Sequence, residues 1–207
     1  MARMGDDARV RAARRNGGLA AAALAALLAG SCASLRSARA PETGAGAPQA
    51  GYPRVAAARR RQAAELGRLF RAARVAYPAP LFVMAFKRER TLELWGFSAS
   101  RRRYIRIAAY PILAASGDLG PKRRAWDHQV PEGFYHLVRL NPESLYHLSL
   151  QVDYPNRSDR LLGDREDPGS DIYVHGDRVS DGCLPIGDHA IEQLYLAVLD
   201  SRAAGHP

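Results

Sequence analysis

Cysteine is scarce in this sequence, with only Cys32 and Cys183 in 207 residues. Small disulfide-rich domains need several cysteines, so that class is excluded. Long apolar runs are also missing, because the run at 19–29 has eleven residues and a helix that crosses a bilayer needs roughly 20. No internal repeat is visible. What is left is a globular, loop-containing domain behind an unusual N-terminal segment.

The N-terminal segment has the pattern of a secretory signal. Residues 1–18 contain five arginines, and the short apolar run at 19–29 is followed by small residues. This order is typical of a signal peptide, so we expect an exported protein with a signal over 1–40. Cleavage after Ala40 and lipid attachment at Cys32, in a lipoprotein-like box, both stay open. Either event leaves Cys183 as the single free thiol.

The rest of the chain divides into a linker, a helix and one domain. Residues 41–53 are rich in Pro, Gly and Ala and read as a linker. Residues 54–78 have apolar residues at helical spacing and predict an amphipathic helix that Pro78 stops. Residues 79–207 form the domain.

Within the domain, strand-like runs alternate with long loops. The hairpin 81–87 and 91–97 comes first, and further strands are predicted at 103–112, 133–140, 146–154 and 171–176. Loops are predicted at 116–132 and 155–170, and a last helix at about 189–202 with Asp188 as its N-cap. The pattern indicates an α+β fold, predominantly β, with a helix before it and a helix after it.

Charge is unevenly distributed along the chain, whose formal net charge is +9. Residues 51–130 hold 17 basic and 5 acidic side chains, whereas 150–200 hold 4 and 11. A basic half beside an acidic half can steer a charged polymer. For an exported chain we expect no nucleic acid partner, and an anionic wall or membrane surface instead.

The stretch "DIYVHGDRVSDGCLPIGDHAIEQLY", residues 171–195, places His175 eight positions before Cys183. A neighbouring imidazole can take the proton of a thiol and so create a nucleophile. Gly176 and Gly182 permit the chain reversal that brings the two together, and Gly182 leaves peptide N–H groups uncovered for an oxyanion.

Two other interpretations of the loop stay open. A metal site would use His175, Cys183 and His189, with His128 in addition, but their spacing fits poorly with the close ligand pairs of zinc sites. The residues can also be ordinary polar residues of a hairpin. We predict no metal and no cofactor.

Several motifs, taken in order, resemble the L,D-transpeptidase catalytic domain (YkuD type), most of all its YafK-like branch of murein L,D-transpeptidases and amidases. They are "FKRERTLELW", "SGDLGPKR", "PEGFYHL", "NPESLYHLSLQVDYPN" and "DIYVHGDRVSDGC", and they cover most of 80–200. The resemblance implies a sandwich-like fold, with Cys183 as the nucleophile that accepts the acyl group and His175 as its general base.

The resemblance also assigns the residues around this pair. Gly176, Ser180 and Gly182 fall on the small residues of the family motif and are expected to shape the pocket and the oxyanion site. Asp181, which lies between Ser180 and Gly182, is expected to line the same pocket. Pro131, Gly133 and Tyr173 are expected to line the substrate cleft.

Two positions depart from the common family pattern. Asp181 stands where many members have a second His, and Pro185 stands where many have an Arg. The first difference leaves His175 in place as the base. The second removes a cation that would hold a substrate carboxylate or an acceptor. The YafK-like branch shares both the short spacing from His to Cys and the lack of that Arg.

The implied function is cysteine acyl transfer in the periplasm, on the L,D peptide bond of peptidoglycan stem peptides. Hydrolysis, with release of a wall-linked lipoprotein or trimming of the stem, and transpeptidation are both open. Membrane contact is expected only through the signal or a lipid anchor. The alternative is a non-catalytic peptidoglycan-binding or tethering domain, in which the basic residues at 101–103 and 122–124 grip an anionic polymer.

Overall fold

The computed structural model describes residues 49–206. The predicted signal peptide over 1–40, the lipoprotein-like box at Cys32 and most of the linker over 41–53 lie outside the described residues. The described part begins with a short 3-10 helix, η1 (Gln49–Gly51). No helix in the described part is long and apolar enough to cross a membrane.

The first long helix, α1 (Pro53–Ala73), is amphipathic, as its sequence predicts. One face is buried, and its residues recur three or four positions apart: Val55, Ala58, Gln62, Leu66 and Phe70. The predicted end of the helix, at 78, is wrong. Arg74 takes a left-handed conformation (φ 56°), and its N–H donates to the carbonyls of Arg71 and Phe70. This C-terminal cap ends the helix before Pro78 can act.

The first sheet has three antiparallel strands: β1 (Leu81–Phe86), β2 (Thr91–Ser98) and β3 (Arg103–Pro111). The predicted hairpin is confirmed, because Phe86 pairs with Thr91 across the polar turn. Leu92 and Leu94 of the central strand are fully buried. This sheet forms one wall of the core.

The second sheet carries the His–Cys stretch. Its strands are β4 (Leu137–Asn141), β5 (Ser149–Val152), β6 (Tyr173–His175) and β7 (Leu184–Pro185), in that order. The pairs β4–β5 and β5–β6 are antiparallel, whereas β6–β7 is parallel. The strands are shorter than predicted, and the sequence gives no signal for β7, which has only two residues.

Two helices follow in the second half of the chain. Helix α2 (Arg157–Leu162) lies inside a predicted loop and is held by a capping box between Asn156 and Asp159. Helix α3 (Asp188–Ala203) is the predicted last helix, but its N-cap is Gly187 and not Asp188. The Asp188 carboxylate instead accepts a hydrogen bond from the N–H of Asp177, 2.9 Å away.

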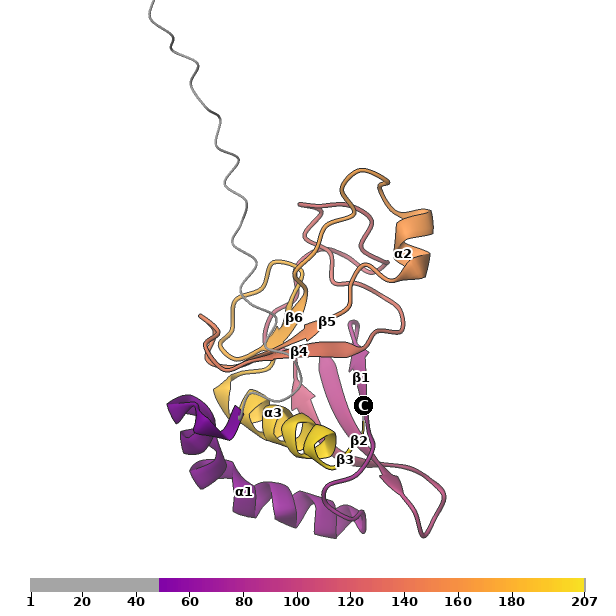
Figure 1. Cartoon of the computed structure of the whole chain (residues 1–207). Helices are drawn as coiled ribbons and strands as arrows, with labels where there is room; N and C mark the ends of the chain where they lie inside the picture. Colours follow the sequence, from indigo (N-terminus) through magenta and orange to yellow (C-terminus); the bar gives the residue numbers. More distant parts are fainter. Residues whose placement is uncertain (1–48, 207) are drawn as a thin grey trace, which may run out of the picture. The chain divides into compact units, whose positions relative to one another are not determined.

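Figure 1 shows α1 and α3 running beside each other below the second sheet, with α2 and the long loops at the other end of the domain. Ion pairing of Arg59 with Asp200 and a hydrogen bond between Gln62 and Gln193 join the two helices. The architecture is consistent with an α+β domain. The expected predominance of β-structure is corrected, because the helices hold slightly more residues than the short strands.

Candidate active site

His175 and Cys183 lie at neighbouring positions of the second sheet, one at the end of a strand and the other just before one. His175 is the last residue of β6, and Cys183 directly precedes β7. The parallel register pairs Val174 with Leu184 and His175 with Pro185. Side chains alternate between the two faces of a strand, so this register, continued one residue before β7, places Cys183 on the same face as His175. Val174 and Leu184 project from the other face, into the core.

The imidazole of His175 is buried and fixed in orientation. Its Nδ1 lies 2.6 Å from the carbonyl oxygen of Gly176, so Nδ1–H is the donor and Nε2 is left as the basic nitrogen. The ring of Tyr146 packs against it, with 4.7 Å between the ring centroids. Burial lowers the pKa of His175, and the bond to Gly176 opposes this only in part. The imidazole is therefore neutral near pH 7, as a general base must be.

The thiol of Cys183 is in its protonated form in this environment. Its Sγ donates to the carbonyl oxygen of Asp171, 3.7 Å away. Burial raises the pKa of Cys183, a hydrogen bond from the backbone of Tyr173 lowers it, and the carboxylates of Asp181 and Asp171 raise it further. The site thus favours a neutral thiol beside a neutral imidazole, so the proton has to move at the moment of attack.

The turn between the two residues is held by specific hydrogen bonds. Ser180 donates from Oγ to the carbonyl oxygen of Cys183 (2.7 Å), and the Gly182 N–H donates to the Oγ of Ser116 (2.7 Å). Gly182 has a φ of +85°, a conformation that suits glycine. These bonds fix the backbone on the N-terminal side of the nucleophile.

Gly176 is required for a different reason: other atoms of the protein lie too close to its Cα to leave room for a side chain. A Cβ at this position would lie 2.5 Å from Oδ1 of Asp188 and 2.7 Å from the carbonyl oxygen of Tyr146. The residue after the base therefore packs directly against a neighbouring backbone. Any side chain here would displace the end of β6.

Asp181 is exposed and interacts with His128 of the long loop. His128 Nδ1 lies 2.5 Å from Asp181 Oδ1. In residues 49–206, no three His, Cys, Asp or Glu side chains are grouped as ligands of one metal ion. The four residues of the metal interpretation, His128, His175, Cys183 and His189, are thus not assembled in that part of the chain.

The two long loops are ordered and joined to each other. Asp127 organises the first loop, because it binds Lys122 and accepts hydrogen bonds from the N–H groups of Arg123, Arg124 and Gln129. These donors keep the pKa of Asp127 well below its usual range, although burial opposes them. The N–H of Ala125 donates to Asp167 in the second loop.

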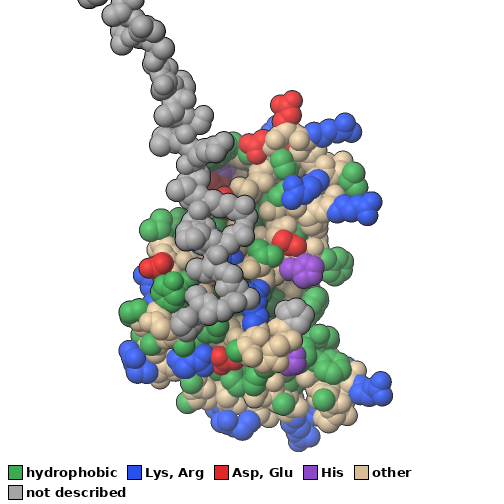
Figure 2. Space-filling view, in the orientation of Figure 1, with side chains coloured by type: hydrophobic (Ala, Val, Ile, Leu, Met, Phe, Trp, Pro, Cys, Tyr) green, Lys and Arg blue, Asp and Glu red, His purple; other side chains and the backbone are tan. Residues whose placement is uncertain are grey.

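The basic residues offer less for polymer binding than the sequence suggests. Lys122 is buried against Asp127, so it cannot grip a polymer. Arg101, Arg102 and Arg103 are exposed. On the face seen in Figure 2, Lys and Arg side chains are spread around the outline and do not gather in one patch.

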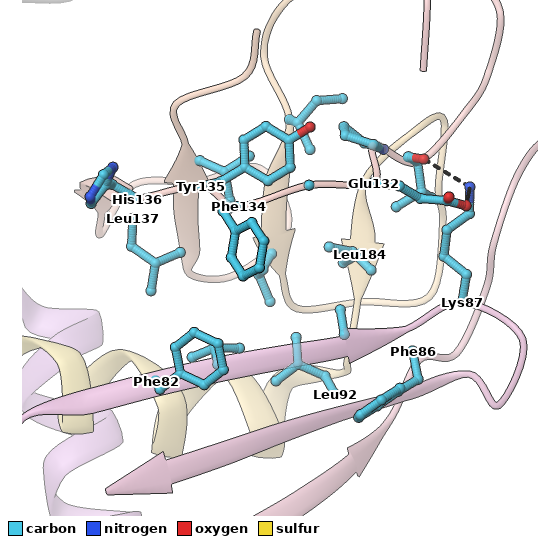
Figure 3. Close-up of a pocket in the computed structure, with 18 of the residues that line it drawn as sticks. Phe82, Phe86, Lys87, Leu92, Glu132, Phe134, Tyr135, His136, Leu137 and Leu184 are labelled. Carbon is cyan, nitrogen blue, oxygen red and sulfur yellow. Dashed lines mark hydrogen bonds and ion pairs between the residues drawn. The ribbon is translucent and has the colours of Figure 1, made fainter. Parts of the chain in front are cut away.

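An apolar cavity of about 750 Å³ lies behind the sheet that carries His175 and Cys183. Figure 3 shows Phe82 and Leu92 of the first sheet facing Leu137 and Leu184 of the second, with the ion pair of Lys87 and Glu132 at one end. Since Leu184 points away from the Cys183 face, this cavity is separate from the nucleophile.

The residues expected to line the substrate cleft are thereby divided. Pro131 and Gly133 line the apolar cavity, whereas Tyr173 lies on the face of Cys183 and directly beside it. Cys183, His175 and Tyr173 thus share one face of the second sheet, while Pro131 and Gly133 line the cavity behind it. Gln129, two residues before Pro131, approaches the site loop, because its carbonyl oxygen lies 3.1 Å from where a Cβ of Gly182 would be.

Three residues of the site were not identified from the sequence: Ser116, Tyr146 and Asp171. Ser116 and Tyr146 stand within motifs of the resemblance, but their contacts with Gly182 and His175 depend on loops that are distant in sequence. Asp171 has a positive φ of 58°, which is uncommon for a residue with a side chain. No local pattern in the sequence predicts these contacts.

No protein-family profile matches the chain. The chain is 35% identical over 131 residues to the "Putative L,D-transpeptidase YafK" of Escherichia coli K12, covering 62% of this chain and 51% of that protein. The protein of the same name from E. coli O157:H7 matches equally well. The chain thus spans about half the length of the curated relatives it matches.

Among solved structures, the "Structure of Bdellovibrio bacteriovorus Bd1075" is 27% identical with a TM-score of 0.42, over 56% of this chain and 43% of that one. The matches to the two YafK proteins support the L,D-transpeptidase family for this chain, the same family that the sequence motifs resemble.

Proposed function

We propose that the protein is a cysteine acyl-transferase that acts on the L,D peptide bond of peptidoglycan stem peptides. The observation that carries the proposal is that His175 ends β6 and Cys183 directly precedes the neighbouring strand β7, with His175 Nδ1 held by the Gly176 carbonyl. This arrangement leaves Nε2 as the base for the thiol. The similarity to YafK supplies the substrate class.

In the first half-reaction, His175 Nε2 takes the proton of Cys183 as Sγ attacks the carbonyl carbon on the L-centre side of the bond. The Gly182 N–H is engaged with Ser116, so we assign oxyanion stabilisation to the N–H of Cys183 itself. When the tetrahedral intermediate collapses, the C–N bond breaks, and His175 returns the proton to the leaving amine. A thioester on Cys183 remains.

In the second half-reaction, an acceptor attacks this thioester and releases the thiol. Water yields hydrolysis, by which the protein would trim stems or release wall-linked lipoprotein, and an amine yields a new cross-link. We favour hydrolysis because the chain resembles the branch that includes amidases. The periplasm is the compartment in which this substrate and a signal-bearing protein would meet.

The test is mass spectrometry of muropeptides from sacculi incubated with the purified protein, beside a Cys183→Ala variant. We expect a Cys183-dependent product: loss of a terminal residue, release of a wall-linked peptide or a new 3–3 dimer. Full activity in Cys183→Ala would refute the mechanism. Unchanged muropeptides, with both proteins still bound to the sacculi, would favour the tethering alternative.

A further inference from the structure

A row of polar side chains crosses the second sheet and ends at Cys183. Arg139 of β4 pairs with Gln151 of β5, and Gln151 pairs with Tyr173 of β6. The parallel register of β6 and β7 pairs Val174 with Leu184, and continued by one residue it brings Tyr173 level with Cys183. Residues directly opposite each other on neighbouring strands share a face. Arg139, Gln151, Tyr173 and Cys183 therefore stand side by side on the face that also carries His175.

Arg139 occupies this row with part of its guanidinium unsatisfied. The side chain is half-buried, and its buried Nε has no hydrogen-bond partner among residues 49–206. A buried donor without a partner is costly, and a guanidinium presents donors in a planar fork that matches a carboxylate. The free donor therefore fits a carboxylate brought in by a ligand.

Tyr173 connects this guanidinium to the nucleophile. Burial raises the pKa of Tyr173, the nearby Asp171 carboxylate raises it further, Arg139 lowers it and Cys183 raises it slightly. The strand register accordingly places Tyr173 between Arg139 and Cys183 along the row. A group that Arg139 holds would lie on the same face as the reacting carbonyl.

The donors between the two ends are already turned toward a carboxylate. Gln151 Nε2 and the Tyr173 hydroxyl each donate to Oδ1 of Asp171 over 3.4 Å, and Ser170 Oγ donates to Oδ2 over 2.9 Å. The two 3.4 Å bonds are long, so these donors can turn to a ligand, but the Asp171 carboxylate beside them would repel a second carboxylate. Binding of a ligand carboxylate therefore depends on the Arg139 cation at the end of the row.

The separation along the row requires the long Arg139 side chain to lean toward Cys183 if it is to meet a group close to the scissile bond. Three strand spacings of about 4.8 Å place the backbones of Arg139 and Cys183 roughly 14 Å apart. Pro185, at the position where many family members carry Arg, lies opposite His175 and has no donor of its own. Arg139 approaches from the other edge of the sheet and provides a cation on the same face.

We propose that Arg139, with Gln151 and Tyr173 beside it, forms a carboxylate-binding subsite for the free terminal carboxylate of the stem peptide, next to the bond that Cys183 attacks. This inference rests on the proposed function and names the residue that would set its specificity. It makes the protein selective for stems that end in a free carboxylate over stems that are amidated or extended at that position.

The test compares a stem tetrapeptide with its C-terminal carboxamide, as substrates and as ligands of a Cys183→Ala background by calorimetry. We expect the carboxylate peptide to be favoured, and Arg139→Gln to lower its affinity and kcat/KM by about 10- to 100-fold, mostly through KM, with little effect on the carboxamide. Arg139→Lys should recover only part of the loss, because it keeps the charge without the fork. Arg103→Gln, at an exposed site of β3, is the matched control and should change neither value.

A preference for the carboxylate that persists in Arg139→Gln would overturn the subsite and leave the proposed function intact. Equal losses for both peptides in Arg139→Gln would also overturn it, because they would indicate a structural role. If the wild type neither binds nor cleaves either peptide, the subsite falls together with the proposed substrate, and the muropeptide analysis decides that question separately.

Discussion

Cys183 should react slowly with iodoacetamide at neutral pH and much faster at alkaline pH. Only the thiolate reacts, and burial together with Asp181 and Asp171 raises the pKa of Cys183. At an ordinary cysteine pKa of about 8.5, roughly 3% of the thiol is ionised at pH 7 and about 76% at pH 9. A raised pKa widens this ratio, so the rate should increase by at least about 25-fold, and toward 100-fold, between these pH values.

The assay follows carbamidomethylation of Cys183 by mass spectrometry of its tryptic peptide, which separates this thiol from Cys32. His175→Asn is the informative control. Because we expect a neutral thiol beside a neutral imidazole, this variant should be alkylated at nearly the wild-type rate at pH 7, although its acyl-transfer activity is lost. A rate that is nearly constant from pH 6 to 8 and falls in His175→Asn would reveal a preformed thiolate–imidazolium pair and refute the reasoning.

Two further predictions concern stability. Gly176→Ala should cost about 1–3 kcal/mol of folding stability and abolish activity, because its Cβ would lie 2.7 Å from the Tyr146 carbonyl oxygen. Gly51→Ala is the control, since Gly51 lies in open space, and it should change the thermal unfolding midpoint little. Equal midpoints for the two variants would contradict this account. Glu192→Ala should cost about 1–3 kcal/mol in urea unfolding, because the buried carboxylate binds Arg61, Gln62 and His147, and of these the half-exposed Arg61 can be hydrated in the variant. Burial raises the pKa of Glu192, but these partners lower it overall. The stability that the ionised carboxylate contributes is therefore present above its unfolded pKa of about 4.3 and is lost as the pH falls below that value. If Glu192→Ala destabilised the protein as much in acid as at neutral pH, the loss would not come from the ionised carboxylate.

The elements with a clear periodic pattern were predictable from the sequence. The buried face of α1 and the β1–β2 hairpin follow directly from the spacing of their apolar residues. Element ends were less predictable. Helix α1 ends at Arg74, which takes a left-handed conformation. Glycine is the residue that usually marks such a helix end in a sequence, so an arginine in that place does not predict it.

The short elements around the site depend on partners. Strand β7 has two residues, too few for a periodic pattern, and it forms because β6 pairs with it in parallel. Gly187 serves as the N-cap of α3 because the Asp188 carboxylate binds the N–H of Asp177 in the site loop. A capping pattern in the sequence cannot predict this, because the competing donor, the N–H of Asp177, is brought to Asp188 only by the fold.

The sequence alone determined which residues we propose for the chemistry, since a lone thiol, a histidine eight positions earlier and glycines between them form a pattern that is local in the chain. Only the tertiary structure decided the states and surroundings of those residues. Burial shifts the pKa of Cys183 up and that of His175 down, Tyr146 covers the imidazole, and strand register places Arg139 three strands away in the row of Cys183. Desolvation and sheet register arise from residues far apart in sequence, and so they exist only once the chain has folded.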